Sequence, residues 1–339
     1  MSDATVAGAN GAHADRPPAV SVRGLAKRYD QVDAVAGIEF DVQAGETFGF
    51  LGPNGAGKST TIGMLCTLVR PTGGRATVAG HDVGTERDEV RRNIGLVFQD
   101  TTLDSYLSAE QNLRLHAELY GVPRAVVGER MREVMEMVGL WERRASLVRT
   151  FSGGMKRRLE IARGLLHSPR VLFLDEPTVG LDPQTRSSIW GYIRELKQRE
   201  DITIFLTTHY MDEAEYCDRI AIMDRGRIIV LDTPEALKAS VGRDRVMIGT
   251  DDDDAAIAAL RERFGLDATV AEGLVTVAVE SGESFVPRLF AELGVPIKSV
   301  SVSRPSLDDV FMSYTGTTIR DAEATANDRN RQFARIMAR

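Results

Sequence analysis

The chain has 339 residues, a length that predicts about two domains. Its formal net charge is −7, so no overall basic field attracts nucleic acid, and we expect no nucleic-acid partner. Only two cysteines occur, Cys66 and Cys217, which argues against a disulfide framework and is typical of a reducing compartment.

Residues 1–18 are rich in Ala, Gly, Asp and Pro, and they predict a disordered leader. They lack the basic start and the apolar core of a secretory signal. No apolar run elsewhere approaches the roughly 18 residues that suggest a membrane-spanning helix. A role in transport across a membrane therefore requires a separate membrane subunit.

Residues 20–51 alternate in the manner of antiparallel strands, with a turn at Ala44-Gly45. Residues 48–51 form a short apolar run that predicts a buried strand, and residues 60–68 predict a helix. A glycine-rich loop lies between them. The order of strand, loop and helix is the context in which such a loop binds phosphate.

The loop fits the pattern G-x-x-x-x-G-K-S/T of a phosphate cradle. Gly55 and Gly57 allow N–H groups to turn toward phosphate, and the helix N-terminus adds unpaired donors. Lys58 supplies a cation for the β- and γ-phosphates, and the Ser59 hydroxyl is a candidate Mg²⁺ ligand. An ordinary glycine-rich turn is the weaker alternative, because the strand and the helix are both in place. The predicted nucleotide-binding residues of this segment are Gly52, Pro53, Asn54, Gly55, Ala56, Gly57, Lys58, Ser59 and Thr60.

Residues 102–168 are predicted to be mostly helical. Ser152 is a good helix N-cap within this stretch. Apolar residues follow it at helical spacing, at Met155, Leu159, Ala162 and Leu166. A well-capped amphipathic helix explains the serine, but it explains Gly153 and Gly154 less well because glycine lowers helix stability. Exposed N–H groups beside these glycines predict an anion site.

Residues 171–174 form an apolar strand that ends in Asp175 and Glu176. Both carboxylates therefore lie at the C-terminal edge of a strand, where ligands bind in open α/β sheets. Asp175 suits Mg²⁺, directly or through water, and Glu176 is placed to polarise an attacking water as a general base. An ordinary acidic strand end is the alternative, but the phosphate loop already requires a carboxylate on the Mg²⁺ side.

Residues 202–207 form a further apolar strand, separated from the previous one by a helix pattern. This alternation predicts an α/β fold with a parallel sheet and crossover helices. Strands at 220–223 and 227–231 flank a predicted hairpin turn, which completes a domain over residues 19–239. A helical subdomain is predicted within it, at about residues 100–168.

Residues 240–316 predict elements in the order β-α-β-β-α-β, the ferredoxin-like order of a small α+β domain. Asp251 to Asp254 lie at the start of one of its helices, where acidic residues are favourable. A Ca²⁺ loop would need spaced ligands and a closing Glu, which are absent from this run. Residues 317–339 are polar and mixed in charge, and they predict a flexible tail.

The phosphate loop, the Ser-Gly-Gly segment and the Asp-Glu strand end, in this order, resemble the ATP-binding subunits of ABC transporters over roughly residues 20–235. The resemblance implies a P-loop NTPase core with an antiparallel β subdomain and a helical subdomain. In that family the Ser-Gly-Gly segment is the signature motif, which binds the γ-phosphate of ATP held by the opposite subunit. The usual flanking Leu and Gln are Phe151 and Met155 here.

Four further positions resemble functional residues of the family. Tyr29 corresponds to the aromatic residue that stacks on adenine, and Gln99 to the glutamine that approaches Mg²⁺ and moves with the membrane partner. Asp182 lies in the loop that crosses the dimer interface, and His209 corresponds to the switch histidine on the γ-phosphate. A hydrophobic strand residue is a fair alternative for Tyr29, and a lone Gln or His is more often structural.

Residues 155–159 and 306–311 resemble the daunorubicin-resistance type of ABC ATPase. The resemblance implies an ATPase that uses ATP and Mg²⁺, forms a homodimer, and drives a separate transmembrane permease from the cytoplasmic face of the membrane. The implied catalytic residues are Glu176, His209 and Gln99, and the implied Mg²⁺ ligands are Ser59, Gln99 and Asp175. Export of a drug or antibiotic is the favoured function, and export of lipid or polysaccharide is the next.

Other classes of ATPase fit less well. A chromosome-structure ABC ATPase inserts a long coiled coil before the signature, but no sustained heptads lie between Lys58 and Ser152. Translation factors of the family usually carry two cassettes, and only one phosphate loop occurs here. A GTPase or another P-loop protein gives no reason for the Ser-Gly-Gly segment or for His209.

Overall fold

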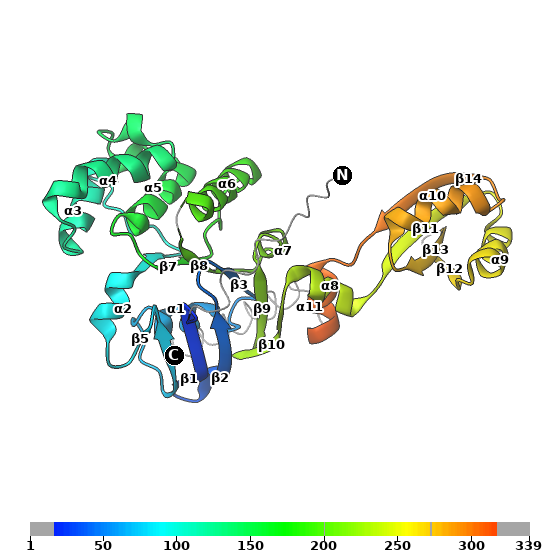
Figure 1. The fold of residues 1–339 in the computed structure, drawn as a ribbon, viewed down its shortest axis with the longest axis horizontal. Coiled ribbons are helices and arrows are strands. Elements are labelled where there is room, and N and C mark those ends of the chain that lie inside the picture. Colours follow the sequence, from blue (N-terminus) through cyan, green and yellow to red (C-terminus); the bar gives the residue numbers. More distant parts are fainter. Residues whose placement is uncertain (1–16, 200, 272, 317–339) are drawn as a thin grey trace, which may run out of the picture. The chain divides into compact units, whose positions relative to one another are not determined.

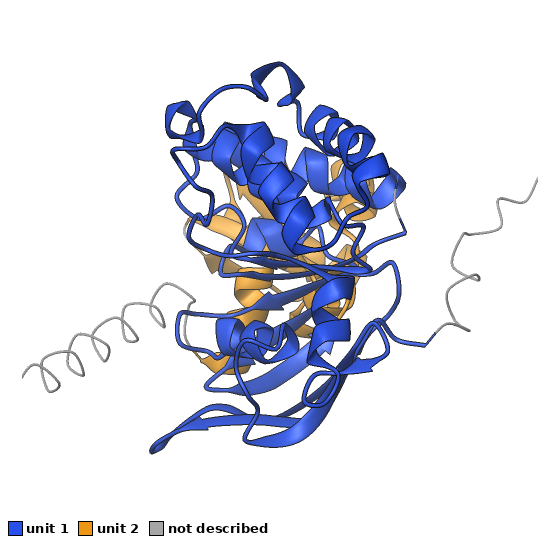
Figure 2. Ribbon diagram, turned by 90° about the vertical axis from the view of Figure 1, so that its left-hand side faces the viewer, with its two compact units in different colours: residues 1–231, 319–339 blue, residues 232–318 orange. Residues whose placement is uncertain are grey.

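The computed structural model describes residues 17–199, 201–271 and 273–316. The chain divides into two compact units, the first reaching Leu231 and the second beginning at Asp232 (Figure 2). The sequence predicts this division after residue 239, within a helix that belongs to the second unit, α8 (Pro234–Val241). Residues 1–16 of the predicted leader and the predicted tail at residues 317–339 lie outside the described residues.

A six-stranded sheet in the order β10-β9-β3-β8-β7-β6 forms the centre of the first unit (Figure 1). Its strands are β3 (Thr47–Leu51), β6 (Ile94–Val97), β7 (Val171–Asp175), β8 (Thr203–Thr208), β9 (Arg219–Asp224) and β10 (Arg227–Asp232). The four pairs from β9 to β6 are parallel: β9 with β3, β3 with β8, β8 with β7, and β7 with β6. The predicted parallel sheet is confirmed, and the loops that follow β3, β6, β7 and β8 leave it at one edge.

Every residue of β3 and of β7 is buried, as expected of parallel strands covered on both faces. The ring of Phe205 on β8 has its centroid 5.4 Å from that of Phe48 and 5.0 Å from that of Phe50. The predicted buried strand at residues 48–51 is confirmed. The prediction that the antiparallel strands extend to residue 51 is wrong, because β3 pairs in parallel with β8 and β9.

The predicted antiparallel subdomain is confirmed for the strands before β3. Its sheet has the order β2-β1-β4-β5. The strands are β1 (Val20–Tyr29), β2 (Val32–Val42), β4 (Gly73–Val78) and β5 (His81–Asp82). Val20 pairs with Val42 on one side and with Val78 on the other. All three side chains belong to a buried apolar cluster that also holds Phe48 and Phe50, so the two sheets share one core.

Seven helices and two short 3₁₀ turns are described in the first unit. They are α1 (Lys58–Leu65), α2 (Arg87–Asn93), α3 (Ala109–Leu119), α4 (Arg124–Met137), the turns Trp141–Arg143 and Val148–Thr150, α5 (Gly153–Leu165), α6 (Pro183–Arg199) and α7 (Met211–Ala214). Helices α3, α4 and α5 form the predicted helical subdomain (Figure 1). Within the described residues, no helix combines the length and the apolar composition that crossing a bilayer requires.

Helix α5 lies against strand β6 at a contact between two glycines. A Cβ atom on Gly95 would lie 2.3 Å from the carbonyl oxygen of Gly164, a distance that a real Cβ atom does not adopt. The backbones of helix and sheet therefore approach more closely here than any side chain permits. This contact fixes the C-terminal end of the helix that begins after Ser152.

The second unit is a small α+β domain. Its sheet has the order β12-β13-β11-β14, with every pair antiparallel. The elements are β11 (Asp244–Thr250), α9 (Asp253–Phe264), β12 (Ala268–Ala271), β13 (Leu274–Val279), α10 (Gly282–Glu292), β14 (Ile297–Ser303) and α11 (Leu307–Thr315). Buried side chains of the sheet pack with those of α9 and α10, and α8 packs on α11. The ferredoxin-like prediction is confirmed.

Helix α9 begins in the acidic run of this domain. Asp252 is its N-cap, and the carboxylate accepts a hydrogen bond from the N–H of Ala255 at 3.0 Å. Asp253 and Asp254 occupy the first turn, where the helix dipole favours negative charge. The interpretation of this run as the start of a helix is confirmed.

We expect Gly95→Ala to destabilise the first unit by about 1–3 kcal/mol, because the added methyl group forces α5 away from β6. Gly128→Ala in α4 is a matched control, since nothing lies within 4 Å of its Cβ position and alanine favours the helix. Urea unfolding followed by circular dichroism measures both changes. Equal midpoints for Gly95→Ala and the wild type would contradict the close contact.

Candidate nucleotide-binding site

The glycine-rich loop joins β3 to α1, and the helix spans residues 58–65 rather than the predicted 60–68. Gly55 and Gly57 have φ angles of 83° and 107°, in the left-handed region. A Cβ atom on Gly57 would also lie 2.4 Å from the carbonyl oxygen of Ala34. Glycine is therefore required at this position for both its conformation and its size.

Backbone contacts hold the remainder of the loop. A Cβ atom on Gly52 would lie 2.2 Å from the carbonyl oxygen of Met223, so this residue also has to be glycine. The N–H of Ala56 donates to the carbonyl of Pro53 at 3.2 Å, and the carbonyl of Ala56 accepts from the N–H of Gly226 at 2.9 Å. These contacts anchor the loop to the hairpin turn between β9 and β10.

The open side of the loop is accessible. Asn54, Gly55 and Ser59 are exposed, and Thr60 is half-buried in the first turn of α1. The N–H groups of a first helical turn have no acceptor within the helix. The predicted segment 52–60 thus places the N–H groups of the first turn of α1 beside exposed loop residues, an arrangement that fits a phosphate group.

The ammonium group of Lys58 lies inside this cradle. The side chain is 3% exposed, and its Nζ donates to the carbonyl oxygens of Gly52 at 2.7 Å and of Pro53 at 3.2 Å. The carboxylate of Glu176 lies 3.5 Å from the same Nζ. The loop after β3 and the loop after β7 therefore meet at this cation.

Two side-chain oxygens face each other beside the cradle. The hydroxyl of Ser59 donates to Oδ1 of Asp175 at 3.2 Å, and the hydroxyl of Thr207 donates to the same oxygen at 2.5 Å. Mg²⁺ takes one or two protein oxygens and completes its octahedral shell with phosphate and water. The Ser59–Asp175 pair fits that requirement. No cluster of three His, Cys, Asp or Glu side chains suited to a metal occurs among the described residues.

Glu176 has an uncommon backbone conformation, with φ of 46°. Non-glycine residues adopt this region seldom, and the strain persists only where neighbours hold it. The N–H of Glu176 donates to the hydroxyl of Thr207 at 3.0 Å, on the adjacent strand. The carboxylate is 6% exposed, and Nδ1 of His209 lies 3.4 Å from its Oε1, outside hydrogen-bond geometry.

Opposing effects set the ionisation of Glu176. Burial raises the pKa of its carboxyl group, but His209 and Lys58 together outweigh burial, and the pKa lies below its usual value. The group is therefore an ionised carboxylate at neutral pH. A buried carboxylate at the carboxyl edge of the sheet is able to accept a proton from a nearby water.

Ser152 is the N-cap of α5, as predicted, and its hydroxyl accepts the N–H of Met155 at 3.3 Å. Ser152 and Gly153 are exposed, so the start of this helix is open to a ligand. Gly154 is buried, and a Cβ atom there would lie 2.3 Å from Cγ2 of Thr185. Close packing on α6 thus explains the second glycine, which helix capping alone does not.

Asp182 precedes α6 and binds its first turn. Its Oδ1 accepts the N–H of Thr185 at 3.0 Å, and its Oδ2 accepts the Thr185 hydroxyl at 2.6 Å. The same threonine contacts the position of Gly154. The signature segment and the Asp182 loop are therefore packed together through one side chain.

Tyr29 and Gln99 are exposed. Tyr29 ends β1, and Nζ of Lys27 lies 4.8 Å from the centroid of its ring. Gln99 follows β6 at the same sheet edge as the loops after β3 and β7.

Two buried charged residues of this region, Glu213 and Arg157, are not among the site residues that the sequence predicts. Glu213 on α7 is 1% exposed, accepts hydrogen bonds from the hydroxyls of Thr208 and Thr178, and has a pKa raised by burial. In the sequence, the only indication that Glu213 belongs to this region is its position four residues after His209. Arg157 lies within the segment that carries the family resemblance, but no local pattern predicts its contacts.

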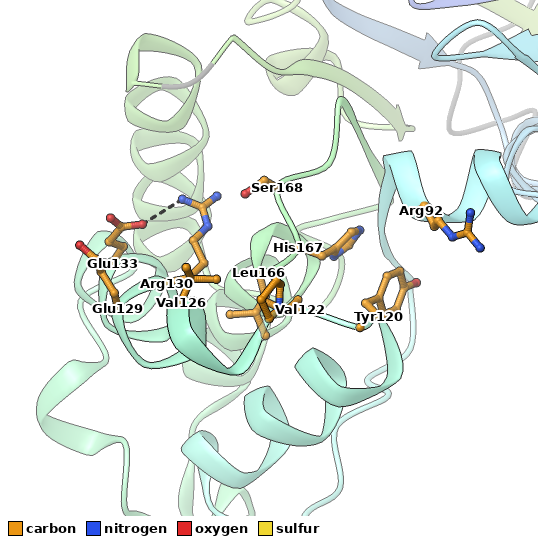
Figure 3. A pocket seen from close by; sticks show the side chains of 12 residues that line it. Arg92, Tyr120, Val122, Val126, Glu129, Arg130, Glu133, Leu166, His167 and Ser168 are labelled. Atoms are coloured by element: carbon orange, nitrogen blue, oxygen red, sulfur yellow. Dashed lines mark hydrogen bonds and ion pairs between the residues drawn. The ribbon is translucent and has the colours of Figure 1, made fainter.

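A cavity of about 560 Å³ lies beside α4 (Figure 3). Helix α4, the loop after α3 and the loop after α5 line it, with Tyr120, Arg130 and His167 among the lining residues. Arg130 forms an ion pair with Glu133 at 3.1 Å on its wall. None of the predicted nucleotide or Mg²⁺ residues contributes to this cavity.

Comparison with known families agrees with this geometry. Residues 35–179 match the family described as "ABC transporter". Residues 233–315 match the family described as "ATP-binding protein DrrA1-3-like, C-terminal domain". The first match covers the phosphate loop, the signature segment and the end of β7. The second match covers the small α+β domain.

Curated relatives are similar over nearly the whole chain. The daunorubicin/doxorubicin resistance ATP-binding protein DrrA of Streptomyces peucetius is 41% identical, over 88% of this chain and 92% of its own length. The linearmycin resistance ATP-binding protein LnrL of Bacillus subtilis is 39% identical, over 88% and 98%. The Nod factor export ATP-binding protein I of Ralstonia nicotianae is 36% identical, over 90% and 96%.

Solved structures of ABC ATP-binding proteins share the fold over most of this chain. The cbiO1 protein of Clostridium perfringens, part of the ABC transporter complex cbiONQ, aligns with a TM-score of 0.62 and 29% identity, over 74% of this chain and 97% of its own. The dimeric post-hydrolysis structure of the ATP-binding cassette MJ0796 bound to ADP and Pi aligns with a TM-score of 0.58 and 27% identity, over 63% and 98%.

The lowered pKa of Glu176 predicts a pH-dependent contribution to stability. Because the folded-state pKa lies below the usual 4.5, the ionised group stabilises the fold above that pH, and the contribution is lost as pH falls through the folded-state pKa. Between about pH 5 and pH 3, the free energy of unfolding should therefore fall less for Glu176→Gln than for the wild type. Urea denaturation at a series of pH values measures this, and parallel pH dependences would contradict it.

Proposed function

Because this chain belongs to the ABC transporter ATP-binding proteins of the daunorubicin-resistance type, we propose that it powers the export of a drug or antibiotic through a separate membrane permease. It is the ATPase subunit of an ABC exporter. Relatives named for resistance to daunorubicin, doxorubicin and linearmycin support the proposed class of cargo. In this proposal the chain is a peripheral protein on the cytoplasmic face of the membrane.

The observation that most supports the proposed chemistry is the meeting of Glu176 with Lys58 and His209 at the carboxyl edge of the sheet. In the proposed reaction, Lys58 and the loop N–H groups hold the β- and γ-phosphates of ATP. Glu176 takes the proton of the attacking water as general base, and His209 contacts the γ-phosphate. Tyr29 stacks on the adenine.

Ser59 and Asp175 are the proposed protein ligands of Mg²⁺, with Gln99 approaching from the end of β6. Their support is the 3.2 Å contact between the Ser59 hydroxyl and the Asp175 carboxylate, both hard oxygen ligands. The metal ion supplies charge neutralisation for the phosphates. Thr207 orients Asp175 through its hydrogen bond to the same carboxylate oxygen.

Two copies of the chain are proposed to close around ATP. Ser152, Gly153 and Gly154 of one copy would bind the γ-phosphate held by the other, and Asp182 would lie at the interface between them. The exposed start of α5 and the dimeric form of the related cassette MJ0796 support this arrangement. The higher affinity of ATP for the closed dimer drives closure, and hydrolysis with product release reverses it.

A second candidate is the export of another kind of compound by the same ATPase mechanism. The relative from Ralstonia nicotianae is named for Nod factor export and is similar over 90% of this chain. The residues of the ATPase site do not separate the two candidates, because the permease carries the cargo. Co-purification of the permease from membranes, followed by binding assays on the complex, distinguishes them.

Glu176→Gln should retain ATP binding and lose turnover by about a hundredfold or more, because an amide does not accept the proton of the attacking water. The variant should accumulate as an ATP-bound dimer. Phosphate release measures turnover, and size-exclusion chromatography with ATP measures dimerisation. Glu142→Gln, at an exposed glutamate, is the control that should leave both unchanged. Near-normal hydrolysis by Glu176→Gln would reject the general-base role.

Shared sites predict rescue between two inactive variants. Lys58→Ala removes the phosphate-loop cation and leaves the signature intact, whereas Ser152→Arg blocks the signature and leaves the loop intact. A mixed dimer then contains one site with both defects and one intact site. Mixing the two purified variants should therefore restore part of the ATPase activity.

The control for this rescue is each variant alone, which should be inactive at the same total concentration. Native mass spectrometry verifies that mixed dimers form. Verified mixed dimers without activity would count against the shared-site arrangement, or would show that both sites must act together.

A further inference from the structure

The guanidinium group of Arg157 lies beneath the loop that carries Glu176. Arg157 belongs to the second turn of α5 and is 7% exposed. Its Nε donates to the carbonyl oxygen of Pro177 at 2.5 Å, and its Nη2 donates to the carbonyl oxygens of Asp175 at 3.1 Å and Glu176 at 3.2 Å. Three consecutive carbonyl groups are thus bound by one side chain.

The same guanidinium reaches the loop of Gln99. Its Nη1 donates to the carbonyl oxygen of Phe98, the residue immediately before Gln99, and lies 3.3 Å from a carboxylate oxygen of Glu160. Glu160 is 2% exposed, and its other oxygen accepts the N–H of Thr102 at 2.8 Å. Arg157 therefore connects the helix of the signature with two separate loops at the edge of the sheet.

The shape of the arginine side chain suits this task. A guanidinium presents its N–H donors in a rigid planar fork, whereas a lysine ammonium is a point charge with three donors. Burying an unpaired charge is costly, and Glu160 supplies the opposite charge here. The carbonyl groups define the path of the backbone at Glu176, whose φ of 46° is held by its neighbours.

We propose that Arg157 is a positioning residue for the ATPase reaction, which holds the Glu176 loop and the Gln99 loop in a fixed relation to the signature helix. The proposal rests on the proposed roles of Glu176 and Gln99. A displacement of α5 on contact with the partner's nucleotide would then move both loops of its own subunit. Arg157 contacts neither nucleotide nor metal in this role.

Arg157→Lys tests the proposal, because it retains the positive charge beside Glu160 but lacks the fork that spans three carbonyls and Phe98. We expect kcat to fall by about ten- to a hundredfold, since small misplacements of a catalytic group have effects of this size. The Kd of ATP should change by less than about threefold, because the phosphate loop is untouched. Urea unfolding confirms that the variant is folded under the assay conditions.

Arg158→Lys is the matched control. This neighbour on α5 donates to the carbonyl of Val138 at 2.9 Å and contacts the hydroxyl of Tyr192 at 3.2 Å, and it reaches neither loop. Its kcat should stay close to that of the wild type. An equal loss of kcat in both variants, or a parallel loss of ATP binding in Arg157→Lys, would indicate general damage to α5 and overturn the positioning role. An unchanged kcat in Arg157→Lys would also overturn it.

Glu160→Gln provides a second variant in case Arg157→Lys does not fold. It keeps the size of the side chain and the contact with Thr102, but it removes the charge that pairs with Arg157. A smaller loss of kcat at unchanged ATP affinity supports the proposal, and full kcat contradicts it. Glu176→Gln, assayed in parallel, separates the two hypotheses. Normal hydrolysis by that variant rejects the proposed general base, whereas its inactivity beside a fully active Arg157→Lys rejects only the role of Arg157.

Discussion

The burial of a carboxylate beside an ammonium group, Glu176 and Lys58, is the constraint on which the architecture of the site depends. The two side chains are 6% and 3% exposed. Taking each ion out of water costs several kcal/mol, so each must find partners within the protein. Lys58 donates to the carbonyl groups of its own loop, and it also supplies the opposite charge beside Glu176. The two loops therefore have to meet for the buried carboxylate of Glu176 to be tolerated.

Strand β8 makes this meeting possible because it lies between β3 and β7 in the sheet. Its last two residues are threonines that serve both neighbours. Thr207 bonds to Asp175 and to the N–H of Glu176, while the carbonyl of Thr208 accepts the N–H of Gly52 at 3.3 Å. The loops after β3 and β7 are therefore aligned by a strand that comes later in the chain than either of them.

Local patterns were sufficient for the features that local chemistry determines. The left-handed glycines of the phosphate loop, the N-cap at Ser152 and the acidic start of α9 follow from residue types at short spacing. The partners of a strand do not follow from residue types at short spacing. The alternation up to residue 51 therefore indicated an antiparallel neighbour for β3, which pairs in parallel with β8. Periodicity reports which side of a strand is buried, and it does not report what covers it.

The contacts of buried polar side chains are the second feature that could not be predicted from the sequence. Glu213 and Arg157 hydrogen-bond to residues that are distant in sequence, or to the backbone of other loops, and neither belongs to a short motif with a known geometry. The reason for Gly154 was likewise not visible, since the side chain that requires it, Thr185, lies on another helix. Such contacts depend on the tertiary fold and become predictable only when the neighbours are known.

The close contact between Gly95 and Gly164 is a point about which helix α5 can tilt. It lies near the C-terminal end of the helix, and Ser152 lies at the opposite end, about 18 Å away at the rise of an α-helix. A rigid tilt of about 10° would move Ser152 by roughly 3 Å and Arg157 by roughly 2 Å. Hydrogen bonds do not stretch that far, so the carbonyl groups above Arg157 must either follow the helix or release it. The distance that the Ser152 end of α5 can move is thus limited by how far the loop of Glu176 can move with it.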